Sequence, residues 1–246
     1  MDRQDPVIPD QDVMTQDEVG DIPCQPSRTA IVLEVCVFLF LILPSMVLAY
    51  FAQGEARVSF VLLAVSTIFR DLALVSLILF LAWRDKEPVS RLGLIAKDLD
   101  SNILLGFALF VPFLFVIGAV VQLLNALGLS APSEPGPSFF RVGGRWELAL
   151  AVLLVVVVAV SEETIFRGYL TSRLQTATRS TTAAVLLSAT IFALGHGYEG
   201  PLGVVTVGVM GLIFNLIYLW RKSLVAPIVL HFLQDFLAIV IAPYLH

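Results

Sequence analysis

The chain has 246 residues, of which 58% are apolar and only 14% are charged, and its formal net charge is −5. Soluble globular proteins are about 45–50% apolar and about 25% charged. The composition therefore excludes an ordinary water-soluble domain and indicates a protein that lies in lipid. The sequence holds no glycine-rich phosphate-binding loop and no basic patch with interleaved aromatic residues, so we expect no nucleotide or nucleic-acid partner.

The first 29 residues are polar and acidic. Seven of them are Asp or Glu, namely Asp2, Asp5, Asp10, Asp12, Asp17, Glu18 and Asp21. A segment with this much charge and so few large apolar residues cannot form a packed core, so we expect residues 1–29 to be a disordered tail. The tail also differs from a cleavable signal peptide, which would begin with a basic region and a short apolar run.

Seven apolar runs follow the tail, and a helix needs about 20 apolar residues to cross the hydrocarbon of a bilayer. The runs are continuous rather than alternating, which favours helices over strands. They lie at 30–51, 58–82, 102–128, 147–170, 183–198, 202–220 and 224–243. The sequence therefore predicts an all-α fold, a polytopic membrane helical bundle with about seven transmembrane helices. We expect the run at 147–170, which carries charge in its second half, and the short run at 183–198 to be tilted, partly interfacial or buried among the others.

The loops between these runs differ in their content of Lys and Arg, which gather on the cytoplasmic side of membrane proteins. With seven crossings, the loops on the side of the N-terminus contain Arg84, Lys86, Arg91, Lys97, Arg173, Arg179, Arg221 and Lys222. The loops on the other side contain only Arg57, Arg141 and Arg145. This distribution favours a cytoplasmic N-terminus and a C-terminus on the opposite side.

Three charged residues lie in the second half of the run at 147–170, where the bilayer makes a charge cost about 2.5–3.5 kcal/mol. They are Glu162, Glu163 and Arg167. Glu163 and Arg167 are one helical turn apart, so we expect them to pair. Glu162 lies about 100° around the helix and is left to meet another group. The alternative is that all three residues form an interfacial salt-bridge cluster.

Two histidines also lie in apolar runs: His196 ends the sequence Phe192-x-x-x-His196, and His231 is followed one turn later by Asp235. Acids and imidazoles in a low-dielectric pocket suit hydrolysis by activated water, with a glutamate as the base and a histidine–aspartate pair at the developing oxyanion. The same groups are also zinc ligands, and a bound metal would use Glu162, His196 and His231. The sequence has no HExxH motif, and it leaves direct and metal-bound activation of water open.

The ordered motifs Glu162-Glu163-x-x-x-Arg167-Gly168-Tyr169-Leu170, Phe192-x-x-x-His196 and His231-x-x-x-Asp235 together resemble one known family. This is the CPBP family, the CAAX-protease and bacteriocin-processing (Abi) group, which includes the CAAX prenyl endopeptidases of the Rce1 type. The resemblance covers about residues 145–242. It implies a helical membrane fold in which the acids and histidines face a cavity within the bilayer.

By this resemblance, Glu162 would activate water with His196 as its partner, and His231 and Asp235 would form the oxyanion-stabilising pair. Asp235 departs from the pattern, because the eukaryotic enzymes typically have Asn at that place and an Asp donates a hydrogen bond only when it is protonated. This departure favours a ligand role or a histidine-orienting role for Asp235. The supporting residues would be Glu163, Arg167 and Phe192.

The sequence divides into an acidic tail (1–29), N-terminal transmembrane helices and loops (30–144) and a CPBP-like catalytic membrane core (145–246). The resemblance implies an intramembrane endopeptidase of a multi-pass protein in the bacterial inner membrane, with a membrane-associated protein or peptide as its substrate. Two alternatives stay open. One is a non-catalytic scaffold or bacteriocin-immunity-type protein that retains the motifs. The other is a proton-coupled transporter, since buried acids and histidines also form proton relays.

Overall fold

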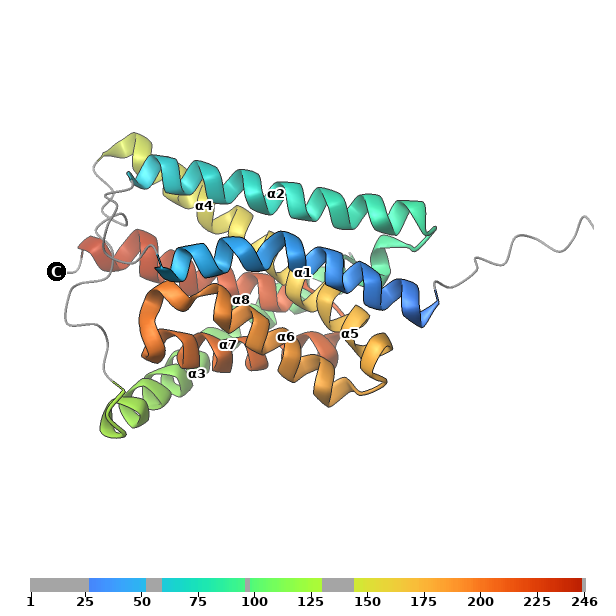
Figure 1. Ribbon diagram of the computed structural model, residues 1–246. Coiled ribbons are helices and arrows are strands. Elements are labelled where there is room, and N and C mark those ends of the chain that lie inside the picture. The colour runs from blue at the N-terminus through green and yellow to red at the C-terminus, as the bar shows by residue number, and fades with distance from the viewer. Residues whose placement is uncertain (1–26, 52–58, 96–97, 130–143, 245–246) are drawn as a thin grey trace, which may run out of the picture.

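A computed structural model describes residues 27–51, 59–95, 98–129 and 144–244 (Figure 1). Within these ranges the chain forms helices and no strands, so the predicted all-α fold is confirmed. Most of the acidic tail predicted at 1–29 lies outside the described residues, as does most of the proline- and glycine-rich segment that precedes Arg145.

The helices follow the predicted apolar runs closely. Their bounds are α1 (Arg28–Phe51), α2 (Phe60–Arg84), α3 (Leu99–Ala126), α4 (Arg145–Glu162), α5 (Thr171–Thr178), α6 (Thr181–Gly195), α7 (Gly200–Arg221) and α8 (Val225–Asp235). A π-helical segment, Glu163–Leu170, joins α4 to α5 without a break, so these three form one long helix. Successive long helices run in opposite directions along the bundle, and the described chain begins and ends at opposite ends of it (Figure 1).

Five helical segments of the described chain are long and apolar enough to cross a membrane. They are Phe60–Arg84, Leu99–Ala126, Arg145–Thr178, Gly197–Arg221 and Val225–Tyr244. The short apolar run at 183–198 corresponds to α6, which has only 15 residues. The protein is therefore an integral membrane protein, and α6 reaches less far through the bundle than its neighbours.

The long helix at 145–178 is the central element of the bundle. Of its most apolar stretch 56% is buried inside the protein, compared with 17% for α2 and for α3. The outer helices instead present large apolar side chains outwards, among them Phe40, Phe69 and Phe115. Such a surface is stable only in lipid. Glu162, Glu163 and Arg167 therefore lie on a helix that is more shielded from the bilayer than α2 and α3.

The helix α2 runs beside the central helix and in the same direction (Figure 1). Phe60 and Ala64 near its start share a packed cluster with Leu154 and Val155 of α4. Further along, Ile78 shares a second cluster with residues of the π-helical segment and α5. A third cluster joins α3, α7 and α8. These clusters hold the central helix between α2 on one side and α6 to α8 on the other.

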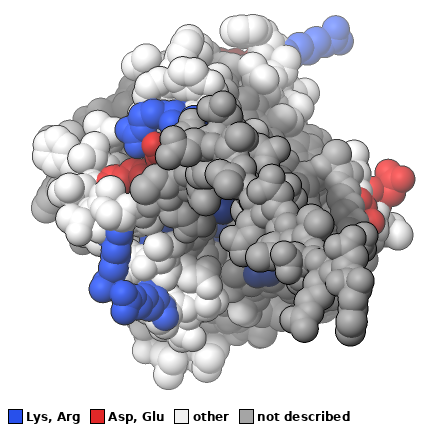
Figure 2. Space-filling model, turned by 90° about the vertical axis from the view of Figure 1, so that its right-hand side faces the viewer, with Lys and Arg blue, Asp and Glu red and all other residues white. Residues whose placement is uncertain are grey.

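Basic side chains gather at the end of the bundle where α1 begins and α2 ends, which Figure 2 shows face on. The described basic residues at the helix ends and turns on this side are Arg28, Arg84, Lys86, Arg91, Arg179, Arg221 and Lys222. At the opposite end, Arg145 begins α4. Among the described residues, basic side chains are therefore concentrated at one end of the bundle.

Candidate active site

The Glu163–Arg167 pair lies at the start of the π-helical segment, and both side chains are fully buried. Arg167 Nη1 lies 2.9 Å from Glu163 Oε1, so the pairing expected from the one-turn spacing is present. Two hydroxyl groups donate to the Phe166 carbonyl oxygen within this segment: Thr171 Oγ1 and Ser188 Oγ, each at 2.8 Å. These bonds satisfy a carbonyl group that a π-helical turn displaces from α-helical pairing.

The Arg167 guanidinium is held between two aromatic rings. Its Cζ atom lies 4.3 Å from the centroid of the Phe192 ring and 5.1 Å from that of Phe214. Aromatic faces attract cations, and the attraction is stronger where water is excluded. Arg167 is therefore fixed by Glu163 and by the rings of α6 and α7.

His231 connects α8 to the acidic motif across 68 residues of sequence. Its Nδ1–H donates to Glu163 Oε1 at 2.9 Å, and its ring stacks on Phe214 at a centroid distance of 5.2 Å. The other nitrogen, Nε2, lies 3.4 Å from Asp235 Oδ2 and 3.9 Å from Glu162 Oε2. Since the carboxylate of Glu163 can only accept, the donated proton fixes the orientation of the imidazole.

Glu162 is buried on the face of the central helix next to His231. Its Oε2 atom has no hydrogen-bond partner within the described chain, and its nearest charged neighbour among the described ion pairs is His231 Nε2 at 3.9 Å. A buried carboxylate oxygen normally has a hydrogen-bond donor. Glu163 Oε2 also lacks a hydrogen-bond partner within the described chain, but Glu163 Oε1 is shared by Arg167 and His231 at 2.9 Å each, and Glu162 has no contact of that length among the described ion pairs.

His196 lies at the C-terminal end of α6 and is partly buried. Its Nδ1–H donates to the Phe192 carbonyl oxygen at 3.0 Å, and its ring packs 4.8 Å from the Phe192 ring. This bond leaves Nε2 as the acceptor of the neutral ring. Among the hydrogen bonds and ion pairs of the described residues, none joins His196 to Glu162, whereas one ion-pair contact joins Glu162 to His231.

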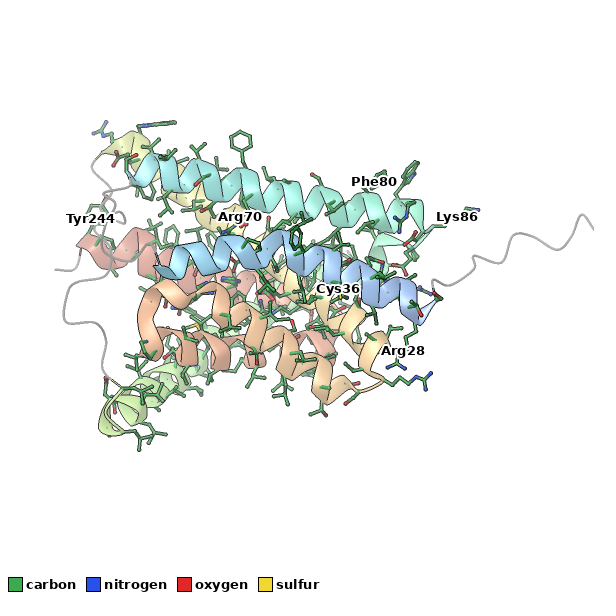
Figure 3. The ribbon with its side chains drawn as sticks, viewed as in Figure 1. Arg28, Cys36, Arg70, Phe80, Lys86 and Tyr244 are labelled. Carbon is green, nitrogen blue, oxygen red and sulfur yellow. The ribbon has the colours of Figure 1, made fainter. Side chains whose placement is uncertain are left out.

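A second pair of charged residues, Arg70 and Asp71, comes from α2 and was not found by the sequence analysis. Arg70 Nε and Nη2 lie 2.9 and 2.8 Å from Asp71 Oδ1, and Asp71 is 1% exposed. Since α2 packs against α4, this pair lies on a helix that neighbours the one with Glu162. Figure 3 shows Arg70 near the middle of α2, on the side that faces the other helices. The sequence could have indicated this pair, because Arg70 and Asp71 are two adjacent charged residues inside the apolar run at 58–82.

The residues considered as metal ligands do not meet in one group. In the part of the chain that the structure describes, no three side chains of His, Cys, Asp or Glu are arranged to hold a metal ion. The set Glu162, His196 and His231 therefore stays a prediction for the case that the protein binds a metal. A pocket of about 540 Å³ between α1 and α2 is lined by Glu34, Phe38 and Arg84 among others and includes none of the clustered acids and histidines.

Comparison with known proteins gives one family match. Residues 144–237 match the family model described as type II CAAX prenyl endopeptidase Rce1-like. The match includes the central helix, α6, α7 and His231 with Asp235, and it leaves α1, α2 and α3 outside. No curated protein and no solved structure matches the chain.

Proposed function

We propose that this protein hydrolyses a peptide bond of a membrane-associated protein or peptide, with Glu162 activating the water, because residues 144–237 match the family model of the type II CAAX prenyl endopeptidases of the Rce1-like kind. The observation that carries the proposal is the contrast between two adjacent glutamates. Oε2 of each glutamate lacks a hydrogen-bond partner within the described chain. Glu163 is nevertheless held through Oε1 by Arg167 and His231, at 2.9 Å each, whereas the ion-pair contact of Glu162 is His231 Nε2 at 3.9 Å. Such a carboxylate is suited to accept a proton from water.

In the proposed reaction, Glu162 takes a proton from a water molecule as its oxygen attacks the scissile carbonyl carbon. The C–O bond forms, the tetrahedral intermediate carries the negative charge on the former carbonyl oxygen, and the C–N bond then breaks. Glu162 returns the proton to the departing amine nitrogen, which leaves a carboxyl group and a new amino terminus. The reaction therefore needs no reactant other than water and the peptide, and Glu162 is regenerated.

His231 is the proposed donor to the developing oxyanion, through a proton on Nε2. Its Nδ1–H bond to Glu163 holds the ring in place, and Asp235 at 3.4 Å from Nε2 acts as the orienting acid. A donor that is fixed before the reaction stabilises the oxyanion without reorganisation. His196 is the proposed second water ligand, because its Nδ1 is bound to its own helix and its Nε2 is an acceptor.

The proposed setting is a bacterial inner membrane with the N-terminus in the cytoplasm. The basic end of the bundle contains the start of α1 (Figure 2), and basic residues gather on the cytoplasmic side of membrane proteins. Glu162 is residue 18 of the 34-residue segment Arg145–Thr178, so the site lies near the middle of the bilayer. A substrate must reach this depth, which favours a protein or peptide that is itself associated with the membrane.

The test is reconstitution of the purified protein in phospholipid vesicles with a library of fluorescence-quenched apolar peptides. We expect wild type to cleave some members and Glu162→Gln to lower kcat by about 10²–10⁴-fold, since the general base is lost. His196→Ala should lower kcat as well. Glu147→Gln, the same change in the first turn of the same helix, is the matched control and should retain wild-type rates.

Cleavage at wild-type rates by both Glu162→Gln and His196→Ala would contradict the proposed mechanism. A wild-type protein that cleaves nothing, while a bound partner or an immunity phenotype survives Glu162→Gln, would instead favour the non-catalytic scaffold.

A further inference from the structure

The pocket of about 540 Å³ between α1 and α2 has an apolar part and a polar part. Its polar lining residues are Glu34, Arg84 and Asp85, and its apolar ones include Phe38 and Leu77. Because α1 begins and α2 ends at the basic end of the bundle, the polar residues lie nearer that end than Phe38 and Leu77 do. Ligand sites of about 300–1,000 Å³ typically combine apolar walls with a few polar groups. The pocket therefore suits a molecule with an apolar chain and one polar end.

The polar part of this pocket lies at the level where the membrane meets water. The aromatic side chains of Phe80 and Trp83 are exposed on this last part of α2. Figure 3 shows Phe80, Arg28 and Lys86 at the same end of the bundle. Trp residues are enriched at membrane–water interfaces, and Lys and Arg flank membrane helices. A phospholipid of the adjoining leaflet would thus bring its head group to the polar lining residues and an acyl chain to the apolar ones.

Glu34 is the lining residue whose charge the protein leaves partly unmatched. Arg84 and Asp85 neutralise each other through two hydrogen bonds, at 2.8 and 3.1 Å. Glu34 Oε1 accepts from Tyr169 Oη at 2.7 Å and from Arg173 Nε at 3.1 Å. Glu34 Oε2 takes part in none of the contacts among the described residues, although the side chain is only 10% exposed. A carboxylate oxygen so shielded normally has a donor, so a donor from outside the chain fits here.

The charges around Glu34 do not balance within the described cluster. Arg173 binds two carboxylates at once: Glu87 through two hydrogen bonds, at 3.1 and 2.9 Å, and Glu34 through one. Arg91 also approaches Glu87, but it is exposed and 3.5 Å away, so it contributes little. One carboxylate is therefore in excess. Because a shielded charge is costly unless it is paired, the cluster favours a cation at the pocket.

We propose that this pocket binds one phospholipid whose head group carries a primary ammonium, as in phosphatidylethanolamine, with an acyl chain between α1 and α2 and the ammonium on Glu34. An ammonium group has three N–H donors, and one of them binds Glu34 Oε2. The quaternary ammonium of phosphatidylcholine has no N–H to donate, and an anionic head group would add negative charge beside an acid. Both helices lie outside the segment that matches the family.

The experiment measures lipid binding to the purified full-length protein in detergent by native mass spectrometry. The probes are phosphatidylethanolamine, phosphatidylcholine and phosphatidylglycerol with identical acyl chains. We expect wild type to bind one phosphatidylethanolamine at least about tenfold more tightly than either other lipid, as for a hydrogen bond to a charged group. Glu34→Gln should abolish this preference, because it removes the charge and keeps an oxygen that accepts from Tyr169. Glu147→Gln, the same change at the opposite end of the bundle, is the matched control and should retain the preference.

Val37→Trp tests the acyl-chain part of the pocket and does not depend on the folding of Glu34→Gln. Val37 lines the pocket and is exposed, so the larger side chain occupies the pocket without entering the core. We expect loss of the bound lipid, whereas Val111→Trp, at a similarly exposed position of α3, should bind it as wild type does.

Three results would overturn the proposal. The first is equal affinity of wild type for the three lipids, or tighter binding of phosphatidylglycerol, which would indicate a site for anionic lipid instead. The second is a preference for phosphatidylethanolamine that persists in Glu34→Gln. The third is unchanged lipid binding by Val37→Trp.

Discussion

Replacing Arg167 by Met tests whether the buried ion pair holds the central helix in place. Met has a similar length and can occupy the space between the rings of Phe192 and Phe214, so the change removes charge more than volume. In the native protein the side chains of Arg167 and Glu163 are both 0% exposed, so neither reaches water or lipid. The variant therefore leaves the Glu163 carboxylate buried with His231 as its remaining partner.

The expected loss follows from the contacts. Removing one partner of a buried pair costs about 3–5 kcal/mol. Since Glu163 keeps its hydrogen bond from His231, we expect a loss near the lower end of this range. The lost cation–π contact of Arg167 is largely replaced by contacts of the Met sulfur with the aromatic rings. We expect Arg167→Met to lower the free energy of unfolding by about 3 kcal/mol, roughly a hundredfold in the folding equilibrium.

The free energy of unfolding is measured by titrating the protein with SDS in mixed micelles and following helix content by circular dichroism. The double variant Glu163→Gln/Arg167→Met removes both charges and should be more stable than Arg167→Met alone, because no unpaired charge remains. Arg84→Met, in an exposed pair with Asp85, is the control and should leave the transition unchanged. A single variant within about 1 kcal/mol of wild type, or a double variant no better than the single, would refute the reasoning.

Two further predictions concern packing and metal dependence. Gly168→Ala should lower the free energy of unfolding by about 1–3 kcal/mol, because the new Cβ would lie 2.6 Å from the Leu92 carbonyl oxygen. Gly118→Ala is the control, since no atom lies within 4 Å of the new Cβ. It should be at least as stable as wild type in the same SDS titration. Dialysis against EDTA should leave the peptide cleavage rate unchanged, since the described residues bring no three metal-ligand side chains together; activity that is lost and then restored by zinc would contradict this.

The helices could be predicted from the sequence because lipid imposes a simple requirement. Each span needs a long apolar run with its backbone bonded internally, so the runs themselves give the helices to within a few residues. The Glu163–Arg167 pair could also be predicted, since a four-residue spacing on a helix determines the neighbourhood without knowledge of the rest of the fold. Both predictions depend only on local geometry.

The contacts between helices could not be predicted in the same way. The motif grouped Glu162 with His196, whereas the structure places His231 nearer, at 3.9 Å from Glu162, and binds His231 to Glu163. Which histidine reaches which glutamate depends on how α6 and α8 pack on the central helix, and the spacing of residues within each helix does not determine that packing. The catalytic roles of these residues stay predictions until the variants are measured.

Arg70 and Asp71 show a different reason for an incomplete prediction. Two adjacent charges leave the mean hydropathy of this long apolar run at 2.0, so α2 is recognised as a membrane helix and its charges pass as a neutral pair. The depth of the pair matters more than its net charge, because a half-exposed guanidinium in mid-bilayer needs an anion or water beside it. The same Arg-Asp sequence recurs at Arg84 and Asp85, where the helix ends and the pair needs no further explanation. Position along the helix therefore separates a pair inside a membrane segment from a pair at its boundary, and the amino-acid sequence already contains that position.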